Sequence, residues 1–148
     1  RRDPFAMLPF IGYHVADYLS HWFEMKDDTT PADLPKFYYV NWFRKDDQGN
    51  FMWPGYGDNS RVLKWIFERS DGKAKGVETP IGIMPDLTEF DTKGLTIKPE
   101  TLKQLFEVDK QAWLKEMADL RDYYQSLGEK MPKALYDELE KEIARLNA

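Results

Sequence analysis

Residues 37–67 read FYYVNWFRKDDQGNFMWPGYGDNSRVLKWIF and combine three local patterns in one continuous stretch. The opening residues, 37–42, are aromatic or β-favouring without clean alternation, which predicts a strand covered on both faces. A charged turn and an aromatic loop with a Pro-Gly pair follow. The Asp-Asn-Ser run at 58–60 supplies good helix N-caps, and apolar residues then recur at helical spacing up to Phe67, so we expect a helix that ends near residues 70–72. This succession of strand, loop and helix indicates α/β organisation.

The rest of the chain is richer in helices than in strands. The spacing of apolar residues predicts four further helices, over 12–25, from Pro99, over 113–127 and over 136–146. Gly128 and Pro132 separate the last two helices, so we expect an antiparallel hairpin. The predicted fold is therefore α/β in the sense of a mixed α+β fragment. It has few strands and about five helices, and it ends in a C-terminal helical hairpin.

Two stretches are predicted to have little regular structure. Residues 4–10 are apolar and contain two prolines, which suits a buried extended segment. Residues 73–98 are rich in turn-forming Pro and Gly, so we expect them to pack as short extended pieces.

The composition predicts a soluble globular protein and argues against a nucleic-acid-binding surface. Hydrophobic residues make up 42% and aromatic residues 15% of the chain, which argues against disorder. The net charge of −5 does not suit a phosphate-neutralising surface. The sequence has no apolar run near membrane-spanning length and no cysteine, so we expect a cytoplasmic protein. The chain begins at Arg1 and runs at once into apolar residues, which predicts a piece of a longer polypeptide.

The aromatic loop has the chemistry of a purine slot. Phe43 leaves the end of the predicted strand, where open α/β sheets place ligands. Phe51 and Tyr56 bracket the Pro-Gly turn, and two flat rings can sandwich a base. The Asn59 amide has both a donor and an acceptor and can match the mixed edge of a guanine. The glycines of the loop let the backbone come close to a ligand.

Three other interpretations of the same residues stay open. Aromatic stretches often form core, and an Asn before a helix often caps it. A carbohydrate-binding module can use Trp53 and Tyr56 as a platform. A non-enzymatic interaction domain can dock a protein partner on its C-terminal hairpin while the aromatic loop forms core.

Four segments resemble the GTP-dependent phosphoenolpyruvate carboxykinases. The segment DPFAMLPF at 3–10, with Gly12-Tyr13, resembles the part of that family that follows its mobile lid. The segments NWFRK at 41–45 and FMWPGYGDNSRV at 51–62 resemble the family's guanine pocket, and TPIG at 79–82 resembles a further family segment. The likeness spans nearly the whole chain and is most specific between residues 35 and 67.

The resemblance implies roles for individual residues. Phe43 and Tyr56 would flank the guanine ring, Phe51 would close the third side, and Asn59 would read the base edge. The family usually carries Phe where Tyr56 stands, and both rings offer the same face. The family usually has Asn where His14 stands, which would alter a polar contact near the cleft. The implied binding set for GTP or GDP consists of Phe43, Phe51, Tyr56, Gly57, Asp58 and Asn59.

The same resemblance implies that the reaction chemistry lies elsewhere. The family's enzyme converts oxaloacetate and GTP to phosphoenolpyruvate, GDP and carbon dioxide in gluconeogenesis, using Mn²⁺ or Mg²⁺. The present sequence has no Gly-x-x-x-x-Gly-Lys-Ser/Thr loop. His14 and His21 lie seven apart, which favours packing or surface roles over metal binding. We therefore expect no catalytic residue and no metal ligand here, and no activity from the chain alone.

The expected organisation and partners follow from this interpretation. The chain would be a C-terminal fragment of the nucleotide-binding domain, with the base-pocket region at 1–98 and the C-terminal helices at 99–148. Its partners would be a guanine nucleotide and the remainder of the parent polypeptide. Nucleic acid and membrane are not expected as partners, and the parent enzyme is expected to be a monomer.

Overall fold

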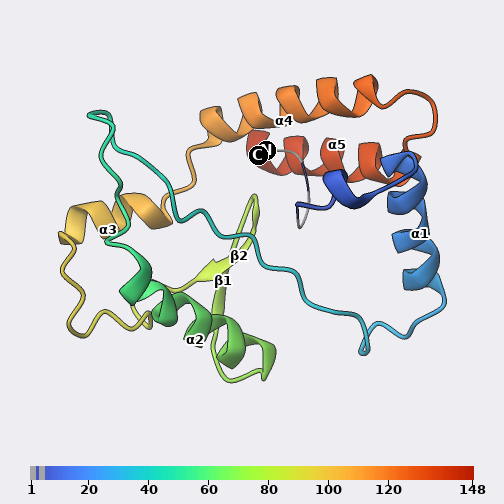
Figure 1. Ribbon diagram of the computed structural model, residues 1–148. Coiled ribbons are helices and arrows are strands. Elements are labelled where there is room, and N and C mark those ends of the chain that lie inside the picture. The colour runs from blue at the N-terminus through green and yellow to red at the C-terminus, as the bar shows by residue number, and fades with distance from the viewer. Residues whose placement is uncertain (1–2, 4–5) are drawn as a thin grey trace. The chain divides into compact units, whose positions relative to one another are not determined.

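Helices dominate the chain in the computed structural model, which describes residue 3 and residues 6–148 (Figure 1). The elements in chain order are η2 (Leu8–Phe10), α1 (Val15–Asp27), η3 (Tyr56–Asp58), α2 (Asn59–Ser70), β1 (Gly76–Thr79), β2 (Gly82–Pro85), α3 (Pro99–Phe106), α4 (Lys110–Ser126) and α5 (Lys133–Asn147). This confirms the predicted mixed fragment with five α-helices and few strands. Within the described part, no helix is both long and apolar enough to cross a membrane.

The chain divides into two compact units. The terminal unit consists of Arg1–Pro35 together with Asp109–Ala148, and the central unit consists of Lys36–Val108. These two units are defined by the contacts within the chain, so they do not test a division by function. The proposed division into a base-pocket region at 1–98 and C-terminal helices at 99–148 stays a prediction.

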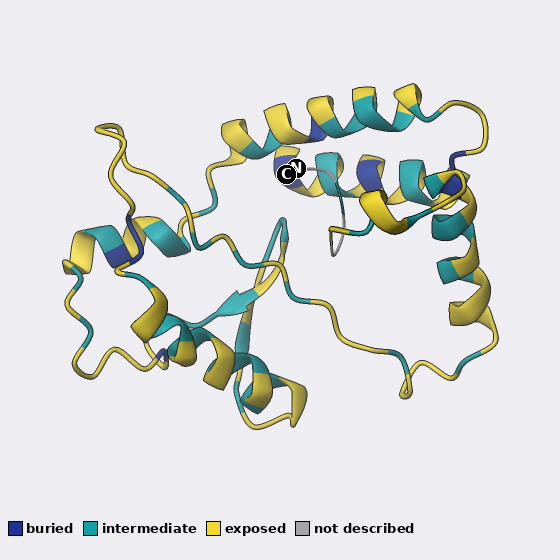
Figure 2. Cartoon of the chain, in the orientation of Figure 1, coloured by how far each residue is buried: buried dark blue, intermediate teal, exposed yellow. Residues whose placement is uncertain are grey.

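The α4–α5 hairpin supplies the core of the terminal unit. The Asp109 carboxylate caps α4 by accepting hydrogen bonds from the backbone N–H groups of its first turn. Gly128 follows α4 with a φ of 75°, a conformation that glycine adopts without strain. The two helices then pack side by side (Figure 1) and bury Met117, Leu139 and Leu146. Figure 2 shows buried stretches of both helices in dark blue. The predicted helical hairpin is therefore confirmed.

His14 has a structural role at the start of α1. Its Nδ1 atom accepts a hydrogen bond from the Ala16 backbone N–H at 3.1 Å, so its ring caps the helix. Asparagine is among the best helix caps, so an Asn at this position can satisfy the same N–H group. The helix begins at Val15 and ends at Asp27, slightly later at both ends than the predicted 12–25.

The prediction of a buried extended segment over residues 4–10 is wrong where it can be checked. Pro4 and Phe5 lie outside the described residues. Leu8–Phe10 form a turn of 3-10 helix, and the Phe10 side chain is 88% exposed. Proline near the start of this turn fixes φ close to its helical value, which favours the helical turn over an extended chain.

The central unit contains the only sheet in the described part of the chain. Strands β1 and β2 are antiparallel, with Gly76 opposite Pro85 and Thr79 opposite Gly82. This agrees with the short extended pieces predicted for residues 73–98. The Phe90 and Phe106 rings pack edge to face at 5.2 Å, which ties the segment before α3 to the end of that helix.

The predicted strand over residues 37–42 does not form. These residues have no regular secondary structure, and the Tyr39 side chain is 87% exposed. A strand exists through hydrogen bonds to a neighbouring strand, and the sheet in the described part of the chain pairs β1 with β2 alone. The β-favouring composition is present, but the described residues give this segment no partner strand.

We predict that Leu146→Ala destabilises the hairpin by about 2–5 kcal/mol, because the Leu146 side chain is 1% exposed and its loss leaves a cavity. Urea unfolding followed by circular dichroism measures this change. The matched control is Leu8→Ala, since Leu8 is 41% exposed and should lose much less stability. Equal effects of the two substitutions would contradict the assigned core.

Candidate functional site

A short hairpin carries the aromatic residues that the sequence singles out. Lys45 and Phe51 form an antiparallel bridge, and the Met52 backbone N–H donates to the Arg44 carbonyl at 2.9 Å. The Arg44 guanidinium donates to the carbonyl of Gln104 in α3 at 2.8 Å, which joins the hairpin to a helix of the same unit. The hairpin therefore has a defined backbone that fixes the position from which Phe51 projects.

The Asp46 carboxylate closes the tip of this hairpin. Its Oδ1 atom accepts hydrogen bonds from the backbone N–H groups of Gln48 at 3.0 Å and Asn50 at 2.8 Å. The Asn50 backbone N–H is the main cause that lowers the pKa of Asp46 from its ordinary value of 3.8. The predicted charged turn is therefore a hydrogen-bonded structure rather than a loose loop.

Phe43 and Phe51 form a ring pair on the exposed side of the hairpin. Their centroids lie 6.1 Å apart with the planes at 65°, an edge-to-face arrangement. Phe43 is 72% and Phe51 59% exposed, so neither ring belongs to a core. The Lys45 ammonium lies 5.0 Å from the Phe51 centroid, within cation–π range. The Asn41 side chain accepts a hydrogen bond from the Phe43 backbone N–H at 3.0 Å and orders the turn before it.

The chain is anchored directly after Phe51. Met52 and Trp53 are both buried, and the Trp53 ring packs against Trp42 with centroids 6.2 Å apart. These side chains point into the unit while Phe51 remains exposed. The segment therefore has one buried face and one face that presents aromatic rings.

Tyr56 stands out as the most exposed large hydrophobic side chain of the described residues, at 93%. Gly55 precedes it with a φ of 131°, which an L-residue rarely adopts, so glycine is required at this turn. Tyr56, Gly57 and Asp58 form the 3-10 turn η3 that leads into α2. A methyl group added at Gly57 would meet nothing within 4 Å, so a ligand can approach the backbone there.

The Asn59 side chain does not cap α2. Asn59 is the first residue of that helix, and its Oδ1 atom accepts a hydrogen bond from the Trp53 indole N–H at 2.8 Å. The interpretation of Asn59 as a helix cap is therefore wrong. Asp58, at the N-cap position, makes no capping bond either, because it pairs with Arg61 at 2.9 Å.

The structure brings together some of the predicted site residues and keeps others apart. Phe43 lies against Phe51, while Tyr56, Gly57, Asp58 and Asn59 follow one another through η3 into α2. Phe43 and Tyr56 make no direct ring contact. Three features were not predicted: Lys45 over Phe51, the closure by Asp46, and the bond from Trp53 to Asn59. Of these three features, only the closure by Asp46 had a signal in the sequence, because the run Asp-Asp-Gln-Gly-Asn at 46–50 is typical of a turn.

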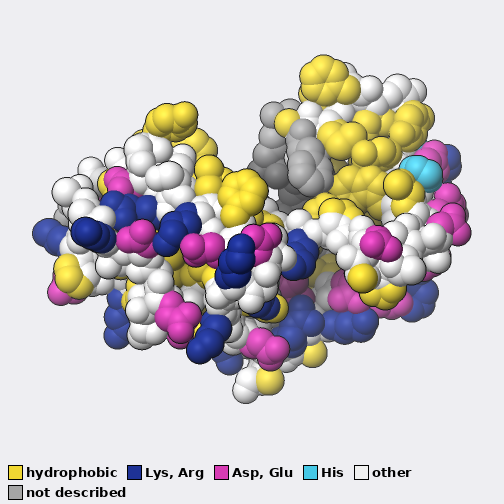
Figure 3. Space-filling model, turned by 90° about the horizontal axis from the view of Figure 1, so that it is seen from below, with side chains coloured by type: hydrophobic (Ala, Val, Ile, Leu, Met, Phe, Trp, Pro, Cys, Tyr) yellow, Lys and Arg dark blue, Asp and Glu magenta, His cyan; other side chains and the backbone are white. Residues whose placement is uncertain are grey.

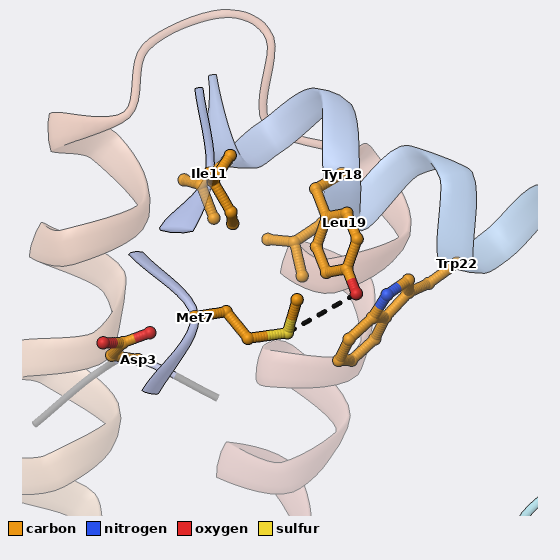
Figure 4. Close-up of a pocket in the computed structure, with 7 residues that line it drawn as sticks. Asp3, Met7, Ile11, Tyr18, Leu19 and Trp22 are labelled. Carbon is orange, nitrogen blue, oxygen red and sulfur yellow. Dashed lines mark hydrogen bonds between the residues drawn. The ribbon is translucent and has the colours of Figure 1, made fainter. Parts of the chain in front are cut away.

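The surface elsewhere offers a weaker candidate. Figure 4 shows a small apolar depression in the terminal unit, where the Tyr18 hydroxyl already contacts Met7 Sδ at 3.4 Å. Its lining has few groups that could read a base.

Within residues 3 and 6–148, no three His, Asp or Glu side chains are grouped as a metal site would require. Figure 3 shows hydrophobic side chains at the surface beside acidic and basic ones.

The sequence has clear relatives. Residues 1–145 match the family model described as the phosphoenolpyruvate carboxykinase C-terminal P-loop domain. The phosphoenolpyruvate carboxykinase (GTP) of Treponema pallidum strain Nichols is 53% identical over 148 residues, 99% of this chain and 24% of that protein. Proteins of the same name from Paenarthrobacter aurescens and Neocallimastix frontalis are each 48% identical, over 95% and 100% of this chain and 23% and 24% of their own lengths. The chain thus spans about a quarter of the length of these relatives.

We predict that the Asp46 closure persists to a pH below 3.8 as the solution is acidified. A lowered pKa means that the carboxylate keeps its bonds above the ordinary value and loses them as pH falls through the folded value. The backbone amide resonances of Gln48 and Asn50, followed by NMR, report the transition.

The control for this titration is Asp46→Asn, which keeps an acceptor oxygen but has no proton to gain in this range. The transition in the Gln48 and Asn50 resonances should disappear in that variant. A midpoint at or above 3.8 in the unsubstituted chain would contradict the assigned hydrogen bonds.

Proposed function

The chain belongs to the GTP-dependent phosphoenolpyruvate carboxykinase family, within its C-terminal domain, and on that premise we propose that residues 43–59 form a guanine slot. The observation that carries the proposal is the exposure of Phe43, Phe51 and Tyr56 on a hydrogen-bonded backbone. Aromatic rings usually bury their area in a core. Rings held out of the core on an ordered hairpin and turn suit stacking against a flat ligand.

In this slot the rings would supply affinity and the polar groups would supply selectivity. Phe43 and Tyr56 would flank the base and Phe51 would close a third side. Stacking on an aromatic ring contributes about 1–3 kcal/mol per base. Asn59 would meet the base edge, while the backbone at Gly57 and Asp58 would lie close to the nucleotide.

The reaction of the parent enzyme is also part of the proposal. The relatives are named phosphoenolpyruvate carboxykinase (GTP). By the family resemblance, the parent would convert oxaloacetate and GTP to phosphoenolpyruvate, GDP and carbon dioxide. We infer a gluconeogenic enzyme of the cytoplasm that acts as a monomer. Its Mn²⁺ or Mg²⁺ would neutralise charge during phosphoryl transfer. The residues described here do not fit a metal site, so no step through the metal is assigned to them.

Two other functions are less well supported. A carbohydrate platform built on Trp53 conflicts with the burial of that ring, which is 8% exposed. An interaction domain with the aromatic loop as core conflicts with the exposure of Phe43 and Tyr56. The guanine slot requires these rings to be exposed, which agrees with the exposure of Phe43, Phe51 and Tyr56.

We predict that the chain binds GDP weakly, because stacking is present while a phosphate-binding loop is absent from the sequence, and in preference to ADP, because Asn59 would meet the guanine edge. Phe43→Ala should weaken GDP binding by about 5- to 150-fold, the loss expected from one stacking contact. Tryptophan fluorescence titration with each nucleotide measures both effects.

Phe67→Ala is the matched control, because Phe67 is 71% exposed and lies in α2 outside the proposed slot. It should bind GDP as well as the unsubstituted chain does. Equal responses to GDP and ADP, or equal losses in the two variants, would count against the slot.

We also expect the 148-residue chain to show no carboxykinase turnover. The reason is that its sequence has no Gly-x-x-x-x-Gly-Lys-Ser/Thr loop, and that no group of metal-binding side chains occurs among its described residues. The assay supplies oxaloacetate, GTP and Mn²⁺ and measures phosphoenolpyruvate. Product formation above that of a heat-denatured sample would overturn the assignment of the chemistry to other parts of the enzyme.

A further inference from the structure

One hydrogen bond inside the proposed slot has a consequence for base selectivity. The Trp53 indole N–H donates to Asn59 Oδ1 at 2.8 Å. Trp53 is buried and its ring is packed against Trp42, so the donor is held in place by the core of the unit. The turn at Gly55 brings the two residues together across η3.

The chemistry of the indole decides which way the Asn59 amide faces. An indole N–H is a donor only, so the amide atom facing it must be the carbonyl oxygen. The amide NH₂ group therefore lies on the side away from the indole. This NH₂ group makes no hydrogen bond to another described residue, whereas the oxygen is already engaged.

We propose that Trp53 is a positioning residue that orients the Asn59 amide so that it offers donors to the purine. The proposal rests on the guanine slot described above. Guanine presents two acceptors, O6 and N7, on one edge, whereas adenine presents an N6 amino donor where guanine has O6. An amide that can turn freely would serve either base. An amide fixed with its NH₂ group toward the ligand favours a purine with an oxygen at position 6.

The contact with Asn59 can be isolated with a second 6-oxopurine nucleotide, inosine diphosphate (IDP), used as a probe. Inosine diphosphate keeps O6 and N7 and lacks only the 2-amino group of guanine. It should therefore share whatever affinity GDP gains from Asn59. ADP should gain none of it.

The first variant that tests the proposal is Trp53→Phe, in the whole 148-residue chain. Phenylalanine keeps an aromatic ring against Trp42 and removes the N–H donor. We expect the affinities for GDP and IDP to fall together, and the preference for GDP over ADP to shrink about 2- to 12-fold, the range for one hydrogen bond. Calorimetric titration is the measurement, because the substitution removes a fluorescent tryptophan.

Trp65→Phe is the matched control, since Trp65 also donates its indole N–H to a protein oxygen, the Lys75 carbonyl at 3.2 Å. It lies outside residues 43–59 and should leave the GDP to ADP ratio unchanged. If Trp53→Phe leaves that ratio unchanged as well, the positioning role is overturned while the slot stands. If the unsubstituted chain does not prefer GDP to ADP, the guanine slot fails and the positioning role fails with it.

A second variant and a second measurement guard against misfolding of Trp53→Phe. Asn59→Asp keeps an oxygen for the indole and replaces the NH₂ donor with an acceptor, so the preference for GDP and IDP should be lost with Trp53 intact. In the unsubstituted chain, GDP and IDP should shift the Asn59 side-chain amide resonances and ADP should not. Retained preference in Asn59→Asp, or equal shifts with all three nucleotides, would overturn the proposal.

Discussion

Trp53 and Met52 are buried directly after Phe51, and this anchor is the constraint on which the rest of the proposed site depends. The hairpin ladder and the Asp46 closure fix the backbone before the anchor, and the Gly55 turn fixes it after. Because the backbone is held on both sides, Phe43, Phe51 and Tyr56 stay exposed without being part of a loose loop. The same buried indole then reaches Asn59, so one side chain supports both the rings and the amide.

The proposed slot would separate recognition of the base from the chemistry of the reaction. The described residues provide aromatic surface, an oriented amide and open backbone at Gly57. They do not provide a metal-binding group. A chain that matches about a quarter of its relatives' length can carry the base-recognition surface while the groups for phosphoryl transfer lie in other parts of the polypeptide.

The features that could be predicted from the sequence are those that depend on neighbours along the chain. Helical spacing identified α2 and the α4–α5 hairpin, since apolar positions three and four apart share a helix face. The prediction of a strand over residues 37–42 was wrong because a strand depends on a partner strand, which residue composition does not specify. The hydrogen bond between the Trp53 indole and the Asn59 amide could not be predicted from the sequence either, since the two residues meet only through the unusual turn at Gly55. The aromatic members of the proposed site were chosen by residue type and by family resemblance, whereas their exposure could be seen only in the structure.

The most direct measurement of the central claim is an NMR experiment that detects contacts between bound GDP and the chain. Nuclear Overhauser effects from the guanine H8 proton should reach ring protons of Phe43 and Tyr56, because the base is proposed to lie between those rings. Contacts of H8 with the α4–α5 hairpin alone, and none with either ring, would contradict it.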